Sequence, residues 1–165
     1  VSIHPFEDGN GRVGRAIAEC ALSQTLGHAS LTGLSSVIAQ RRSDYYDALE
    51  RASRDNEVTE WLRYFSDVVL AGQARSLRFV RFLVEKTRFL DRLRSALNPR
   101  QEKALLRILR EGPDGFQGGL SAGSYMTITG APPATARRDL GALVELGALR
   151  RTGEKRGTRY WLTLE

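Results

Sequence analysis

Twelve residues near the beginning of the chain carry side chains that suit phosphate chemistry. They read His-Pro-Phe-Glu-Asp-Gly-Asn-Gly-Arg-Val-Gly-Arg and occupy residues 4–15. Within this segment, His4 can accept a proton near neutral pH. The carboxylate of Asp8 suits a hard divalent cation such as Mg²⁺ held beside phosphates. With the glycines and arginines that follow, the segment contains a base, a metal ligand and an anion site, which are the components of phosphoryl-type transfer.

The glycines and arginines of this segment predict an anion-binding helix N-terminus. Gly9 and Gly11 flank Asn10 directly before a helical pattern, so backbone N–H groups can converge there on an anion. Arg12 and Arg15 lie three residues apart on that helix and can reach the same polyanion. We therefore expect all five residues to bind phosphates.

Two other phosphate-binding loops are excluded by their context. Gly9-x-Gly11-x-x-Gly14 matches the dinucleotide-binding fingerprint, which requires a β-strand before it and a βαβ unit around it. Here a proline-containing loop precedes the glycines, and helical patterns follow them. A Walker A loop needs Lys-Ser/Thr after its glycines, and the chain has none at this place. A polar turn that merely caps a helix would explain any one of these residues, but not the whole set at this spacing.

Residues 4–15 resemble the motif of the Fic family, His-Pro-Phe-x-Asp/Glu-Gly-Asn-Gly-Arg-x-x-Arg, at every fixed position. More loosely, residues 41–49 and the junction at residues 98–101 are similar to bacterial Fic proteins that carry a C-terminal winged helix. The resemblance implies a protein adenylyltransferase, which moves AMP from ATP to a Tyr, Thr or Ser hydroxyl of a target protein. ATP and Mg²⁺ are the cofactors that it implies.

The same resemblance implies a role for each residue of the loop. His4 would take the proton from the target hydroxyl, and Asp8 would hold Mg²⁺ against the α- and β-phosphates. Phe6 would be a buried anchor for the loop. The anion hole and the phosphate contacts would come from Gly9, Asn10, Gly11 and Arg12. Arg15 would meet the γ-phosphate or, in an autoinhibited protein, a glutamate of the family's inhibitory helix.

Some parts of the family pattern are not found in this sequence. The inhibitory signature Ser/Thr-x-x-x-Glu-Gly/Asn has its first spacing at residues 53–57, but Val58 breaks the match. The upstream helices and the flap that aligns the target peptide are also missing, and the only methionine is Met126. We therefore expect a C-terminal part of a longer protein, inactive by itself.

The pattern of apolar residues predicts a mainly α fold, with the C-terminal helices of a Fic core followed by a winged helix-turn-helix and a small β-hairpin. Helices are expected over residues 10–26, 35–53, 59–97, 99–110, 121–127 and 132–146, and two short strands within residues 149–164. Gly72 is a candidate break in the third and longest helix. Asn98-Pro99 marks the expected boundary between a Fic domain, residues 1–97, and a winged-helix domain, residues 98–165.

The C-terminal part has the order helix, helix-turn-helix and basic hairpin, which is typical of a winged helix. Residues 98–165 hold eleven Lys/Arg and seven Asp/Glu, an excess that suits double-stranded DNA. The expected contacts are Thr135, Arg137 and Arg138 early in the second helix, and Arg151, Lys155 and Arg156 on the hairpin. Pro132-Pro133 weaken the case for base reading. Protein docking, association into a homodimer and plain structural support therefore remain alternatives, as does a DNA-binding transcriptional regulator that carries a Fic module.

The remaining features predict packing or cellular setting rather than chemistry. A single cysteine, Cys20, cannot form an internal disulfide and suits the cytoplasm; its helical neighbours place it in the core. No apolar run reaches the length of a membrane span, and no signal peptide is recognisable. We expect Tyr45 to be packed and Tyr46 exposed, His28 to lie at the surface, and Trp61 and Phe65 to lie in the core.

Overall fold

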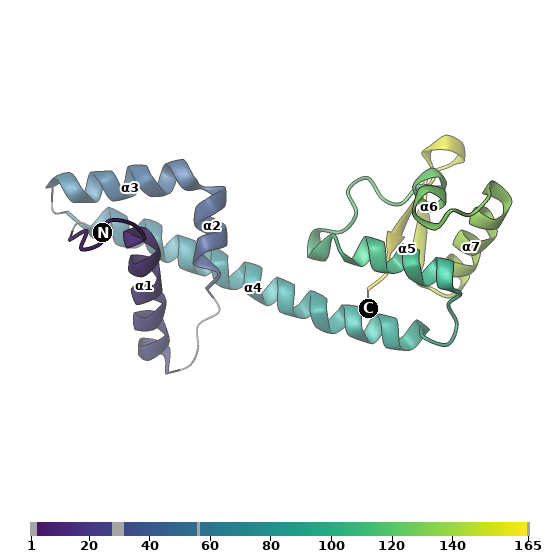
Figure 1. Ribbon diagram of the computed structural model, residues 1–165, viewed down its shortest axis with the longest axis horizontal. Helices are drawn as coiled ribbons and strands as arrows, with labels where there is room; N and C mark the ends of the chain where they lie inside the picture. The colour runs from purple at the N-terminus through teal and green to yellow at the C-terminus, as the bar shows by residue number, and fades with distance from the viewer. Residues whose placement is uncertain (1–2, 28–31, 56, 165) are drawn as a thin grey trace. The chain divides into compact units, whose positions relative to one another are not determined.

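The computed structural model describes residues 3–27, 32–55 and 57–164. The fold is mainly α-helical with a small antiparallel β-hairpin near the C-terminus, as predicted (Figure 1). The chain divides into two compact units, Val1–Arg78 and Phe79–Glu165. The long helix α4 (Thr59–Leu93) contributes residues to both units.

Helix α1 (Asn10–Leu26) begins and ends where the sequence predicts. It starts after Gly9, whose φ of 85° lies in the left-handed region, and it ends at Gly27, whose N–H donates to the carbonyl of Gln24. The side of α1 that packs was predicted wrongly. Leu22 packs against the core of the first unit, whereas Cys20, which we expected in the core, is exposed together with Val13 and Ile17 on the same side of the helix. The contact partners of α1 lie on the opposite side of the helix, where Glu19 accepts a hydrogen bond from Thr32 at 2.9 Å.

The helix predicted over residues 35–53 is in fact two helices, α2 (Leu34–Gln40) and α3 (Arg42–Asp55). The chain bends at Arg41, whose φ and ψ of −121° and 43° are not helical. Leu34, Val37 and Ile38 of α2 are buried, as is Tyr45 of α3. The apolar spacing continues through the bend, so periodicity alone could not reveal it.

Helix α4 is continuous, and Gly72 does not break it. A Cβ at Gly72 would lie 1.6 Å from the carbonyl oxygen of Thr32, so only glycine allows the backbone of residue 32 to approach α4 this closely. Gly72 therefore serves packing rather than bending.

The core of the first unit forms where α2, α3 and the first half of α4 meet. Its buried members are Leu34, Val37, Ile38, Tyr45, Val68 and Val69. Trp61 and Phe65 pack against it partly buried, with their rings stacked at 5.6 Å between centroids. Tyr45 is buried and Tyr46 is exposed, as predicted. The prediction for His28 lies outside the described residues.

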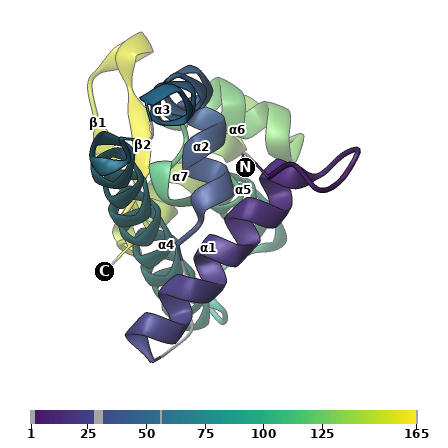
Figure 2. The same cartoon turned by 90° about the vertical axis from the view of Figure 1, so that its left-hand side faces the viewer.

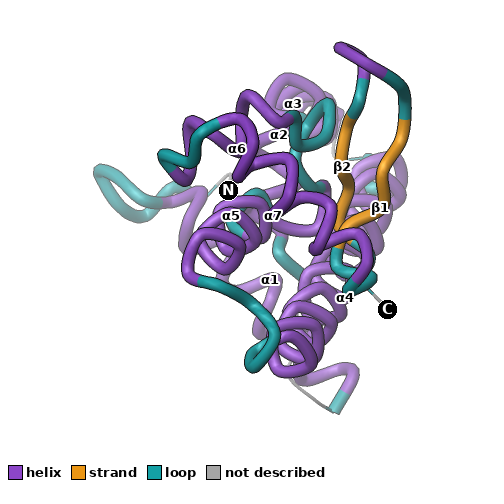
Figure 3. Tube along the Cα trace, turned by 90° about the vertical axis from the view of Figure 1, so that its right-hand side faces the viewer, coloured by secondary structure: helices purple, strands orange, loops and turns teal. Residues whose placement is uncertain are grey.

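The second unit adds three helices and the hairpin to the end of α4: α5 (Pro99–Leu109), α6 (Ala122–Thr129), α7 (Pro133–Glu145), β1 (Leu149–Thr152) and β2 (Arg159–Leu162). Figure 3 shows the hairpin beside α7. The strands are antiparallel, with Leu149 opposite Leu162 and Thr152 opposite Arg159. Short 3₁₀ turns occupy Gly112–Asp114 and Lys155–Gly157.

The junction before α5 is a helix N-terminus of the predicted kind. The side chain of Asn98 accepts from the backbone N–H groups of Arg100 and Gln101, and the side chain of Gln101 accepts from the backbone N–H of Asn98 at 3.0 Å. This reciprocal capping box, with Pro99 in the first turn, fixes where α5 begins. The division into domains between residues 97 and 98 stays a prediction. In the structure, Phe82, Phe89 and Leu93 at the end of α4 pack in the core of the second unit.

A buried carboxylate ties α5, α6 and α7 together. Asp139, only 3% exposed, accepts hydrogen bonds from Arg100 Nε at 2.9 Å and from the Tyr125 hydroxyl at 3.0 Å. Around it lies an apolar core that includes Ala136, Leu140 and Leu143 of α7. Leu146 continues the helical spacing of these residues, which predicts a buried side chain, but it follows the last turn of α7 and is 39% exposed.

Among the described residues, no helix is both long enough and apolar enough to span a lipid bilayer.

Candidate functional site

The loop of residues 4–9 leads directly into α1 (Figure 2). His4 is exposed and has a φ of 42°, in the left-handed region that side chains other than glycine rarely adopt. Such a backbone conformation costs free energy and is found most often in functional loops. The loop therefore combines an accessible imidazole with a defined backbone.

Asn10 connects the loop to the helix. Its Oδ1 atom accepts from the backbone N–H of Phe6 at 3.0 Å, and its Nδ2 atom donates to the carbonyl of Phe6 at 2.6 Å. Asn10 is the one buried residue of α1, at 7% exposed. The Asn10 side chain thus holds the loop, while the backbone N–H of Asn10 belongs to the helix N-terminus that faces a ligand.

Asp8 and Arg12 form an ion pair one helical turn apart. Asp8 Oδ2 lies 3.1 Å from Arg12 Nη2, and Asp8 Oδ1 accepts from the backbone N–H of Gly9 at 2.6 Å. Both side chains of the pair are largely exposed. A ligand or cation in solution can therefore reach the carboxylate and the guanidinium without any rearrangement of the core.

The N-terminus of α1 has the properties of an anion site. No side chain caps the helix, so the first N–H groups, at Asn10, Gly11 and Arg12, lack the acceptor that an N-cap side chain normally supplies. The partial positive charge of the helix dipole is concentrated at the same place. The 17 residues of α1 are enough to develop this dipole.

Arg15 contributes a buried donor to the same end of the helix. Its guanidinium lies against Gly11, where a Cβ would be 3.3 Å from Arg15 Nη1. Its Nε atom is buried, and no residue that the structure describes accepts a hydrogen bond from it. A buried, unsatisfied donor costs about 1–3 kcal/mol, and charged groups cost more. The donor is therefore expected to have an acceptor in the working state of the protein.

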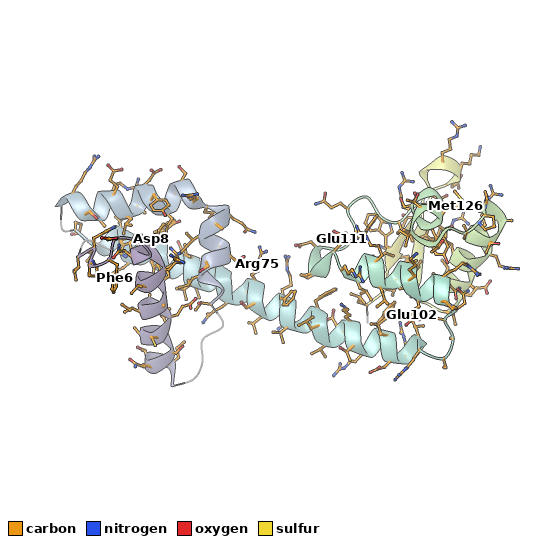
Figure 4. All side chains as sticks on the ribbon, in the orientation of Figure 1. Phe6, Asp8, Arg75, Glu102, Glu111 and Met126 are labelled. Atoms are coloured by element: carbon orange, nitrogen blue, oxygen red, sulfur yellow. The ribbon has the colours of Figure 1, made fainter. Side chains whose placement is uncertain are left out.

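Phe6 is not the buried anchor that we expected. It is 53% exposed, and it lies with Asp8 on the loop that precedes α1 (Figure 4). The loop is held instead by the backbone of Phe6, through the two hydrogen bonds to Asn10. The described part of the chain packs nothing over the Phe6 ring that would bury it.

The described residues contain no group of three or more His, Cys, Asp or Glu side chains arranged to hold a metal ion. Asp8 supplies a single carboxylate. One or two carboxylates together with phosphate oxygens are the usual ligands of Mg²⁺ in nucleotide sites. The donor set thus suits a metal that arrives with phosphates.

The chain was compared with models of known protein families. The model of the Fic/DOC family matches residues 1–22. The Fic/DOC match contains every loop residue described above and the first part of α1, and the rest of the chain lies outside it. The hydrogen bonds of Asn10 and the contact between Gly11 and Arg15 therefore lie within the matched segment.

A second feature is a basic groove in the second unit, which borders α6, α7 and the hairpin and has a volume of about 990 Å³. Five cationic side chains line it, those of Arg137, Arg151, Lys155, Arg156 and Arg159. The one acidic side chain in the lining is that of Glu145. We call this feature the basic groove.

The basic groove contains some, but not all, of the residues predicted to bind nucleic acid. Arg137, Arg151, Lys155 and Arg156 line it together. Arg138 is exposed on α7 outside the groove lining, and Thr135 is only half-buried there. The groove also includes Arg159, which the sequence places on the same basic hairpin, and the beginning of α6, which was not among the predicted contacts.

Proposed function

We propose that the loop and the N-terminus of α1 serve the transfer of AMP from ATP to a hydroxyl group of a target protein. The proposal is supported by the Fic/DOC match over residues 1–22 and by the combination of an accessible histidine, an accessible carboxylate and an uncapped helix N-terminus. The family match alone supports nucleotide chemistry in general. The choice of AMP and of a protein hydroxyl rests on the resemblance of residues 4–15 to the Fic motif.

In this proposal, His4 is the general base. Its imidazole takes the proton from the target hydroxyl as the hydroxyl oxygen forms a bond to the α-phosphorus of ATP. The bond from that phosphorus to the oxygen bridging the α- and β-phosphates breaks, and pyrophosphate leaves. A positioned base typically accelerates such a step by about 10²–10⁴-fold.

The remaining residues hold the phosphates. The N–H groups of Asn10, Gly11 and Arg12 face the anion, and the Arg12 guanidinium exchanges part of its contact with Asp8 for a phosphate oxygen. Asp8, released from that pair, is the carboxylate available to Mg²⁺. The metal, when bound, supplies positive charge against the charge that develops on the phosphate oxygens.

The single observation that carries the proposal is the unsatisfied Nε of Arg15. The half-buried Arg15 lies against Gly11 at an uncapped helix N-terminus, and no described residue accepts from its buried Nε atom. An oxyanion bound at that helix end provides the missing acceptor. Phosphate oxygens suit a guanidinium particularly well, because they can accept two parallel hydrogen bonds.

The test is a transfer assay on the protein with each of the four nucleoside triphosphates, labelled at the α-phosphate. We expect label on protein with ATP, and none when His4 is replaced in the variant His4→Ala. Binding of ATP to that variant should be nearly unchanged, because the base acts in the chemical step. Label from another nucleotide in place of ATP would refute the assignment of AMP, and undiminished transfer by His4→Ala would refute the role of His4.

A further inference from the structure

We propose that the basic groove of the second unit binds the backbone of double-stranded DNA, with α7 as the helix that enters the major groove. This activity is separate from the chemistry of the N-terminal loop, and none of the residues that carry it lies in that loop. Three features of the described residues support DNA binding: the charge of the groove, the shape of the exposed face of α7 and the lack of an exposed aromatic surface in the groove.

The charge of the basic groove is unbalanced. Arg137 reaches it from α7, Arg151 from β1, and Lys155 and Arg156 from the turn between the strands. The ion pairs described in this unit join Arg100 to Asp139 and Arg107 to Glu111, and they leave these four cations unneutralised. Five cations gathered on one concave surface, with Glu145 as the one acid that lines it, attract a polyanion.

The exposed face of α7 is narrow enough to enter a major groove. The residues on that face are Ala134, Arg137, Arg138, Gly141 and Glu145, spaced as one side of a helix, while Ala136, Leu140 and Leu143 are buried on the other side. A helix with average side chains is about 10–12 Å across, and the major groove is about 12 Å wide. Ala134 and Gly141 make this face slimmer than average, so that the two arginines between them can reach base edges or phosphates.

The beginning of α6 contributes further donors at the edge of the groove. Ser121 caps α6 by accepting from the N–H of Ser124, and Ser121, Ala122 and Gly123 line the groove. In helix-turn-helix proteins the first of the two helices crosses the DNA backbone beside the recognition helix. α6 and α7 stand in this sequence order, with the turn at Gly130 between them.

The groove favours duplex over single-stranded nucleic acid. Proteins that bind single strands stack the bases on exposed aromatic rings. The one aromatic side chain that lines the groove is Tyr160, and it is half-buried. A duplex keeps its bases stacked internally and needs only the cations and a slim helix.

The test measures the anisotropy of a fluorescent DNA duplex of about two helical turns, titrated with the whole chain. If all five cations meet phosphates, the slope of log affinity against log salt is about −4.5, which corresponds to a roughly 500-fold loss of affinity between about 50 and 200 mM salt. The variant Arg151→Ala/Arg156→Ala should lower the slope to about −2.7 and weaken binding at least about tenfold at low salt.

The matched control is Lys103→Ala/Arg110→Ala, which removes the same charge from two exposed positions outside the groove, one on α5 and one directly after it. Retained affinity and slope in this control, with loss in the groove variant, support the proposal. It is overturned if no duplex binds at about 50 mM salt, where phosphate contacts are strong. Equal losses in the two variants also overturn it, as does equal or tighter binding of the single strand. The circular dichroism of each variant shows that it remains folded.

Discussion

Asn10 holds the backbone of Phe6 by two hydrogen bonds, accepting from its N–H at 3.0 Å and donating to its carbonyl at 2.6 Å. This two-way contact closes the loop of residues 6–10 onto the first turn of α1. It fixes the position of Asp8 relative to the helix N-terminus and leaves the backbone N–H of Asn10 for an anion. The loop owes its shape to this asparagine rather than to the Phe6 ring, which is half exposed.

The variant Asn10→Ala should therefore loosen the loop without unfolding α1. Loss of the two hydrogen bonds, each contributing about 0.5–1.5 kcal/mol, should speed hydrogen exchange at the Phe6 amide about tenfold or more. The matched control is Gln24→Ala, which removes an exposed amide side chain from the same helix. Unchanged exchange at Phe6 in Asn10→Ala would show that other contacts hold the loop.

Replacing Arg15 should weaken ATP binding without lowering the stability of the fold. In Arg15→Met a buried, unsatisfied Nε is replaced by an apolar side chain, so the melting temperature should stay the same or rise. The affinity for ATP with Mg²⁺, measured by isothermal titration calorimetry, should fall at least about tenfold because a charge-assisted contact is lost.

The control for Arg15 is Arg54→Ala on α3. Arg54 is an exposed arginine paired with Glu50 one turn away, and its loss should leave both ATP affinity and stability nearly unchanged. An Arg15→Met protein that is less stable but binds ATP normally would assign Arg15 a purely structural role.

Asp139 should make the stability of the second unit depend on pH. Burial alone raises the pKa of Asp139, but the hydrogen bonds from Arg100 and Tyr125 outweigh it, and the net pKa is below the ordinary value. A carboxyl whose pKa is lowered in the folded state stabilises that state above its unfolded pKa of about 3.9. This contribution is lost as the pH falls from about 4 through the folded pKa.

The variant Asp139→Asn should accordingly be less stable than the unaltered protein by about 1–3 kcal/mol at pH 7, where Arg100 and Tyr125 lose their charged acceptor. The difference should shrink as the pH falls below about 4. Urea denaturation at several pH values measures both effects, and Glu145→Gln, an exposed change on the same helix, should stay within about 0.5 kcal/mol. A difference independent of pH would contradict the role of the Asp139 charge.

The sequence predicted elements where a local signal existed. Asn98-Pro99 with Gln101 specifies a capping box, and Gly9 and Gly27 specify the ends of α1, so these boundaries follow from a few neighbouring residues. The bend at Arg41 has no such signal, because apolar residues keep helical spacing on both sides of it. Contacts between residues that lie far apart in the sequence could not be predicted either. Asp139 meets Arg100 across 39 residues, and Gly72 receives the backbone of Thr32.

The candidate site was predictable in its residues but not in its contacts. The motif at residues 4–15 indicated which side chains suit phosphate chemistry, because their types and spacing are specific. It could not show that the side chain of Asn10 binds the loop, or that the Nε of Arg15 is buried without an acceptor. The sequence also predicted the wrong face of α1 to be buried. Several apolar side chains lie on one side of this helix, and the partners described in the structure lie on the other.

The position of the label in ATP tests the central claim most directly. Transfer of AMP keeps the α-phosphate on the protein and releases the β- and γ-phosphates as pyrophosphate. The protein, incubated with its target and with ATP labelled at the α- or the γ-phosphate, should therefore retain only the α label, and His4→Ala should retain neither. Retention of the γ label would mean phosphorylation instead and would contradict the proposed reaction, as would an α label that persists in His4→Ala.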